Sequence, residues 1–189
     1  MTARDPRLIR PIAVLVVAAV CVAALVGLVL RENHARSHGT RVTLSMRGAD
    51  PRDLVRGHYV QIQVADQLPA GRACVQKDDG WIAVTSGGGP TDQPVGIYDT
   101  KDEALRNGDH ALRGSMRCTG PGRTDDGGPA TAWLDIGTDR FYINQRDAQD
   151  IDRALASGRR AAAIVSVGTD GRARLVGLDV DGKRYDLHW

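Results

Sequence analysis

Features that would point to a particular chemistry are scarce in this sequence of 189 residues. It holds only three Trp, four Tyr and one Phe, and three cysteines. Neither an HExxH pattern nor a CxxC pair occurs, so the common zinc sites are not indicated. No internal repeat is evident, which argues against a repeat protein.

An excess of charge of either sign is also missing. The chain has 25 Lys and Arg against 23 Asp and Glu, a formal net charge of +2. Three of the basic residues and one acidic residue lie in the first ten positions, which leaves 22 of each in the rest. A balanced domain lacks the basic stripe that phosphate neutralisation requires, so no nucleic acid is expected as a partner. Binding to an anionic lipid surface is disfavoured for the same reason.

What the sequence does contain is one long apolar run, PIAVLVVAAVCVAALVGLVL at residues 11–30. As a helix these residues would rise about 30 Å, the thickness of the hydrocarbon core of a bilayer. Arg4, Arg7 and Arg10 precede the run, and positive flanks stay in the cytoplasm. The sequence therefore predicts a signal-anchor protein of the plasma membrane, spanning it once. The expected parts are a cytoplasmic N-terminus at 1–10, a transmembrane helix at 11–30, a stalk at 31–39 and an extracytoplasmic domain at 40–189.

A cleaved signal peptide is the alternative. The apolar region of such a peptide normally has about 7 to 15 residues and small residues at its end, whereas this run is longer and ends in Leu28, Val29 and Leu30. The sequence Ala35-Arg36-Ser37 has the small-x-small pattern of a cleavage site but lies well past the run, so cleavage there stays open. Cys21 does not resemble a lipoprotein cysteine, because Val20 precedes it.

The domain at 40–189 is predicted to be mainly β, of the β-rich α+β kind. Apolar and polar residues alternate at 42–47 and 59–64, as in half-buried strands. The sequence KDDG at 77–80 indicates a tight hairpin between strands at 73–76 and 81–85, because Asp-Gly suits such turns. Further strands are expected at 112–118, 133–136 and 140–143. The Gly- and Pro-rich stretches SGGGPTDQP and TGPGRTDDGGP are expected to be loops.

The C-terminal part carries the clearest pattern. One helix is expected between Asn144, a capping residue, and Gly158, a helix stop. The Asp-Gly turns of TDGR and DGK then separate strands at 161–167, 173–180 and 185–188, which predicts a three-stranded meander. The stretch 98–108 has room for one helical turn. We expect an antiparallel sheet or a partly closed barrel with one helix in the C-terminal half.

Two of the three cysteines are expected to form a disulfide. Cys74 and Cys118 both lie in the domain and at predicted strands, while Cys21 lies in the apolar run and cannot compete. In an oxidising compartment such an isolated pair is bonded rather than free.

Catalytic chemistry is weakly indicated. His34 and His38 are spaced to share a helix face, but no third ligand is near, so no metal and no cofactor is expected. The segment SMRGADPRDLVRGHYV loosely resembles motifs of bacterial signal peptidases, with Ser45 as nucleophile and Lys77 or Lys101 as its base. Pro51 is displaced from Met46, and Lys77 adjoins a predicted turn. We therefore expect no enzyme, and a Ser/Lys peptidase is the alternative.

The polar loop before the second strand is the remaining candidate for binding. Its charged side chains are typical of a loop that turns a corner through hydrogen bonds to its own backbone, yet polar loops at strand ends also hold binding sites. The candidates are Asp50, Arg52, Asp53, Arg56, Gly57, His58 and Tyr59.

DPRDLVRGHYVQIQV resembles the signature of the GDYXXLXY proteins, which are membrane-anchored bacterial proteins. Gly57, Tyr59 and Ile62 match or conservatively replace their counterparts, while His58 stands for Asp and Val64 for the final Tyr. DRFYINQRDAQDIDRAL and GRARLVGLDVDGK are similar to two further segments of that family. The resemblance implies a protein that works beside other membrane proteins. We expect an extracytoplasmic binding or structural protein, an accessory partner of a membrane protein assembly.

Overall fold

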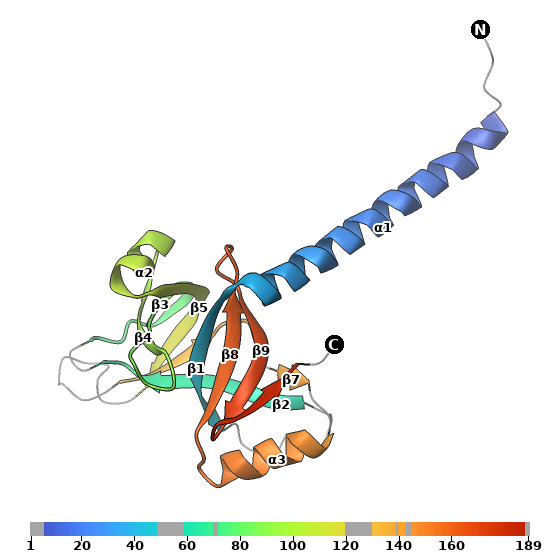
Figure 1. Ribbon diagram of the computed structural model, residues 1–189. Helices are drawn as coiled ribbons and strands as arrows, with labels where there is room; N and C mark the ends of the chain where they lie inside the picture. The colour runs from blue at the N-terminus through green and yellow to red at the C-terminus, as the bar shows by residue number, and fades with distance from the viewer. Residues whose placement is uncertain are drawn as a thin grey trace.

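The computed structural model describes residues 6–48, 59–69, 72–119, 130–138, 140–142 and 145–187. These residues form a mostly β protein with ten strands and three helices, which confirms the expected fold class (Figure 1). The helices are α1 (Pro6–His38), α2 (Lys101–Asn107) and α3 (Gln145–Ala156). The strands are β1 (Thr40–Gly48), β2 (Tyr59–Gln67), β3 (Lys77–Thr85), β4 (Gln93–Tyr98), β5 (His110–Thr119), β6 (Thr131–Asp135), β7 (Arg140–Tyr142), β8 (Ala161–Val167), β9 (Ala173–Val180) and β10 (Lys183–Asp186).

Helix α1 projects from the sheet as a single long rod (Figure 1). From Val14 to Leu30 its large apolar side chains are 51% to 69% exposed, so nothing in the described part of the chain covers them. Among the described residues it is the one helix long and apolar enough to cross a membrane, a property that N-terminal anchors and signal sequences share. The helix does not end with the apolar run, because the expected stalk continues it to His38.

The strands pair antiparallel in one sheet, in the order β10-β9-β8-β1-β2-β6-β5-β3-β4, with β7 paired to β2 outside this path. A single parallel bridge joins Leu44 of β1 to Asp92, directly before β4. There the Asp92 amide donates to the Thr43 carbonyl and the Thr43 amide donates to the Asp92 carboxylate, each at 2.7 Å. One bridge does not make a ladder, so the sheet curls back toward β1 without closing into a barrel.

The core follows the alternation that predicted the strands. On β1, Val42, Leu44 and Met46 are buried, while Thr43 and Ser45 between them are half-buried. Because successive side chains of a strand point to opposite faces, this pattern places one face of β1 against the core. Buried side chains of every strand from β1 to β6 and from β8 to β10 join in one cluster, which also takes in Ile151 of α3.

The hairpin expected at 77–80 is wrong, because these residues belong to β3, which runs on without a turn. A tight Asp-Gly turn needs a positive φ, and Gly80 does not have one. Gly80 is needed for space instead: a Cβ there would lie 2.8 Å from the carbonyl oxygen of Tyr98 and 2.9 Å from the Cγ1 atom of Ile97, both in β4. The register of β3 against β5 also shifts here, as at a bulge.

Strand β4 was not predicted from the sequence, and helix α2 is longer than the single turn expected. β4 begins at Gln93, inside the stretch expected to be loop, and Pro94 is tolerated because β4 is the last strand of the sheet path. α2 has seven residues instead of one turn. Its N-terminus carries a capping box, in which the Thr100 hydroxyl accepts from the Glu103 amide and the Glu103 carboxylate accepts from the Thr100 amide, each at 3.3 Å.

The C-terminal elements confirm the prediction. α3 is followed by Gly158 with a φ of 73°, as expected of a helix stop, whereas Asn144 lies outside the described residues. β8, β9 and β10 form the predicted meander. Asp181 and Gly182 join β9 to β10 with φ values of 57° and 84°, the signs that a two-residue type I′ turn requires.

The expected disulfide is present and links Cys74 to Cys118, with 5.9 Å between the Cα atoms. Cys118 is buried on β5, and Cys74 packs against the main core cluster. Residues 73–76, expected to be a strand, have no regular structure. The bond therefore ties an irregular segment to the sheet.

Candidate functional site

The motif loop lies mostly outside the described residues. Asp50, Arg52, Asp53, Arg56, Gly57 and His58 fall in the gap at 49–58, so their role as a corner or a binding loop stays a prediction. β1 and β2, on either side of the gap, are paired antiparallel, with Gly48 opposite Ile62. The loop therefore joins two neighbouring strands.

Tyr59, the last residue of the candidate set, opens β2 and pairs with Tyr142 of β7. β7 belongs to the second segment that resembles the GDYXXLXY family, and α3 of the same segment packs against β1 and β2. Tyr59 and Tyr142 are 83 positions apart in sequence, so two distant segments meet at one corner of the sheet (Figure 1).

The residues weighed for a Ser/Lys mechanism lie apart. Ser45 is half-buried on β1 and lines a groove of about 560 Å³. The ammonium of Lys77 pairs with the carboxylate of Asp99, and Lys101 donates to the carbonyl of Thr169 at 3.2 Å. Neither lysine lines the groove that Ser45 lines.

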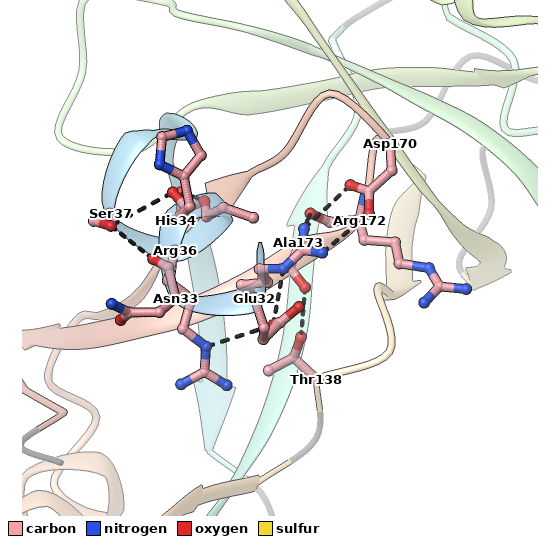
Figure 2. Close-up of polar contacts among 12 residues, drawn as sticks. Glu32, Asn33, His34, Arg36, Ser37, Thr138, Asp170, Arg172 and Ala173 are labelled. Carbon is pink, nitrogen blue, oxygen red and sulfur yellow. Dashed lines mark hydrogen bonds and ion pairs between the residues drawn. The ribbon is translucent and has the colours of Figure 1, made fainter. Parts of the chain in front are cut away.

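The end of α1 is fixed to the sheet by an ion-pair network centred on Arg174 of β9. Figure 2 labels three members of this network, Glu32, Arg36 and Asp170. The Arg174 side chain is only 9% exposed and donates to Glu32 at 2.8 Å through Nε. Its two terminal nitrogens donate to the two carboxylate oxygens of Asp170 at 3.1 and 3.0 Å. Arg36 approaches the same Glu32 oxygen at 3.6 Å. This fork geometry is one that arginine forms and lysine cannot.

The network changes the acid–base properties of its members. The hydrogen bonds from Arg174 are the largest cause that lowers the pKa of Asp170 from 3.8 to about 2. Hydrogen bonding to Asp170 in turn raises the pKa of Arg174 above its usual value. Both groups are therefore charged at every physiological pH, and the ion pair persists.

A second contact beside the network brings the backbone of α1 close to β8. The hydroxyl of Ser166, which is fully buried, donates to the carbonyl of Ala35 at 2.9 Å. Gly39, which follows the helix, has no space for a side chain, because a Cβ would lie 2.7 Å from both the Ala35 and the Val167 carbonyl oxygens. The helix thus enters the sheet through a tight joint.

The turn between β8 and β9 connects this joint to the other half of the sheet. Gly171 in the turn lies against the ring of Trp81, where a Cβ would come within 2.2 Å of a ring carbon. Its carbonyl accepts from the Arg113 amide at 2.8 Å. The guanidinium of Arg113 also lies over the Trp81 ring, 5.5 Å from its centroid. β3, β5, β9 and α1 therefore converge at this turn.

A groove of about 420 Å³ lies beside the joint. The last turns of α1, helix α2, the start of β5 and the β8–β9 turn surround it, all at one end of the sheet (Figure 1). We call it the junction groove. Its cationic and imidazole side chains are Arg31, His34, His38, Lys101, His110 and Arg174. Asp109 and Asp170 are the acidic ones.

The two histidines of the helix stack on each other, with ring centroids 4.3 Å apart. Within the described ranges no three His, Cys, Asp or Glu side chains come together as metal ligands.

Sequence reasoning did not find the junction. Glu32 and Arg174 are 142 positions apart, and Ser166 and Ala35 are 131 apart. The one local signal is Glu32, an acidic residue two positions after an apolar run, which the prediction treated as part of a solvated stalk.

The fold and its joint define a class of protein. It is a mostly β domain that follows a long apolar N-terminal helix and is cross-linked by the Cys74–Cys118 disulfide. The family model of the GDYXXLXY proteins matches residues 21–178, from the second half of the apolar helix to β9. The chain therefore belongs to the GDYXXLXY family. No curated protein and no solved structure matches it.

Proposed function

We propose that this protein is a membrane-anchored extracytoplasmic binding or structural protein, an accessory partner of a membrane protein assembly, without enzymatic activity. The observation that carries the proposal is the joint between α1 and the sheet. A tether that only retains a domain at a membrane needs no such joint. A helix locked by Arg174 and Ser166 holds its domain at a defined height and orientation, as docking on a neighbouring membrane protein requires.

The joint also supports retention of α1 as an anchor. Cleavage at Ala35-Arg36-Ser37 would remove Glu32 and leave Arg174, which is 9% exposed, with one of its two carboxylate partners. Leaving a buried charge partly unpaired costs free energy. The disulfide, the apolar helix and the N-terminal arginines agree with a plasma-membrane protein whose domain is extracytoplasmic.

β1 runs from the joint toward the family signature, which begins two positions after Gly48 in the sequence. From Thr40 to Gly48 the strand rises about 26 Å, at about 3.3 Å per residue. The motif loop that follows Gly48 therefore begins well away from the joint. A strand end held at a fixed distance from the membrane suits contact with the extracytoplasmic part of a partner.

Crosslinking in intact membranes tests the proposal. A chain with a C-terminal tag is crosslinked, solubilised and captured, and it is compared with a variant that carries Gly-Ser-Gly between His38 and Gly39. This insertion keeps the anchor and the domain but frees their relative orientation. The same insertion between Gly88 and Gly89, in an exposed loop, is the matched control.

We expect one set of membrane-protein adducts with the wild type and the control, and its loss with the junction insertion. Identical adducts from all three chains would contradict the proposed role of the joint. Labelling of Ser45 by a serine-acylating probe, abolished in Ser45→Ala, would contradict the non-enzymatic assignment.

A further inference from the structure

We propose that the junction groove binds the phosphate group of an anionic phospholipid. The inference rests on the proposed function in one respect, that α1 spans the membrane. It goes beyond that function by giving the groove a ligand class.

The charges that remain after internal pairing favour an anion. Arg174 and Arg36 face Glu32 and Asp170, so this network is balanced within itself. Outside this network, the charged side chains that line the groove are two cations, Arg31 and Lys101, and one carboxylate, Asp109. The Asp109 carboxylate already accepts the amide of Ser86 at 2.9 Å.

The cations left over are available to a ligand. Arg31 has no ionic partner among the residues that the structure describes, and Lys101 is held by the Thr169 carbonyl and the Trp81 ring without a carboxylate. His34, His38 and His110 add imidazole rings to the lining. One nitrogen of His38 already contacts the His34 carbonyl and one nitrogen of His110 contacts the Ser86 hydroxyl, each at 3.3 Å. The groove therefore offers more donors than acceptors, which is what a phosphate group requires.

With α1 across the membrane, the groove would lie at the level of the lipid phosphates. Arg31 directly follows the apolar run, so it stands at the boundary of the hydrocarbon core. At about 1.5 Å per residue, His34 is about 4.5 Å and His38 about 10 Å further along the helix. The headgroup layer is about 5 to 8 Å thick on each side of a bilayer. The helix wall of the groove thus spans that layer.

The other walls suit an amphiphile. Leu105 of α2 lines the groove and is 44% exposed, and Ala35, Ala111 and Val167 add apolar surface. The volume of about 420 Å³ is within the range of small-molecule sites, about 300 to 1,000 Å³. Apolar contact beside cationic donors favours a lipid over a free inorganic anion.

This proposal agrees with the neutral composition of the domain. Equal numbers of acidic and basic residues argue against a broad basic face for many lipids. A single headgroup requires only a few cations in one place, and the fold collects Arg31 and Lys101 from positions 70 residues apart.

Native mass spectrometry of the full-length chain in an uncharged, phosphate-free detergent tests the proposal. The probes are short-chain phosphatidylglycerol, short-chain phosphatidylcholine and inorganic phosphate, each titrated separately. The wild type is compared with Arg31→Gln/Lys101→Gln. Arg47→Gln/Arg106→Gln is the matched control, because it removes two exposed positive charges from β1 and α2 outside the groove. Thermal unfolding of each variant verifies that it is folded.

We expect the wild type and the control to bind one phosphatidylglycerol saturably. The groove variant should bind it about tenfold or more weakly, because the loss of one charge-assisted hydrogen bond lowers affinity by that factor. The single variant Arg31→Gln, which leaves no partner unpaired, should weaken retention in the same direction. Unchanged retention in the groove variant, or equal weakening in the control, overturns the site. Equal binding of inorganic phosphate overturns the assignment to a lipid. Binding in detergent does not depend on any protein partner, so a negative crosslinking result leaves this test intact.

Discussion

At the scale of single residues, Gly171 occupies a position that excludes a side chain for two independent reasons. Its φ is 76°, in the left-handed region, and a Cβ would meet the Trp81 ring at 2.2 Å. Gly171→Ala should destabilise the domain by more than the backbone cost of about 1 to 2 kcal/mol. The measurement is urea unfolding followed by Trp fluorescence.

Gly137→Ala is the matched control for Gly171→Ala. Gly137 has a similar φ of 73°, but no atom lies within 4 Å of the position of a Cβ. The difference between the two variants isolates the contact with Trp81. Equal destabilisation would show that this contact contributes nothing.

The three Asp-Gly pairs within the described residues show how far local sequence predicts structure. Asp170-Gly171 and Asp181-Gly182 form turns with positive φ at glycine, as expected, while Asp79-Gly80 lies inside β3. The dipeptide is the same in each case. What differs is the close approach of β4 to Gly80, a tertiary contact that no local pattern contains.

The disulfide gives a second prediction at this scale. Cys74 and Cys118 are 44 positions apart, and closing a loop of that length stabilises the folded chain by about 4 kcal/mol through the entropy of the unfolded state. Cys74→Ser/Cys118→Ser should lower the free energy of unfolding by up to that amount, measured in urea. Cys21→Ser, which lies in the apolar helix, is the control and should leave the domain unchanged. A wild type whose stability does not respond to reduction would refute the prediction.

At the scale of elements, the predictions succeeded where a local pattern decides the structure. The meander of β8, β9 and β10 and helix α3 follow from alternation, helical periodicity and turn residues. α1 was predicted by its apolar run, but its continuation to His38 was not. Residues 31–38 are polar, and what holds them helical against the sheet includes Arg174 and Ser166, far away in sequence. The junction groove was missed for the same reason.

The joint between α1 and β9 should make stability depend on pH in acid. The pKa of Asp170 is lowered from 3.8 to about 2 in the folded chain. A lowered folded-state pKa means that this carboxylate stabilises the fold fully above about pH 4, and that the contribution is lost as the pH falls to about 2. The loss amounts to at most about 2 kcal/mol.

Urea unfolding between pH 5 and pH 2 measures this effect, with Asp170→Asn as the variant. Asp170→Asn should be less stable than the wild type at neutral pH, and the difference should shrink toward pH 2. Asp102→Asn on α2 is the control, because Asp102 is exposed and outside the network. A difference for Asp170→Asn that stays constant over this range would contradict the ion-pair role.

At the scale of the whole molecule, β1 connects two distinct regions. One end meets α1 and the junction groove, and the other leads in sequence into the segment with the family signature. The central position of β1 in the sheet makes it a rigid spacer between them. Under the proposed function, β1 would separate attachment to the membrane from contact with a partner.

The proposed function requires one topology, with the domain outside the cytoplasm and α1 retained. The N-terminal flank of Arg4, Arg7 and Arg10 favours a cytoplasmic start, and the Cys74–Cys118 bond suits an oxidising compartment. Protease added to intact spheroplasts should therefore remove a tag placed after Trp189. A tag at the N-terminus should stay protected until the membrane is permeabilised, and the chain should stay in the membrane after alkaline extraction. Protection of the C-terminal tag would refute the topology. Release of the chain on extraction, with its N-terminus beyond residue 35, would show that the helix is a cleaved signal, and the joint through Glu32 would then not exist in the mature protein.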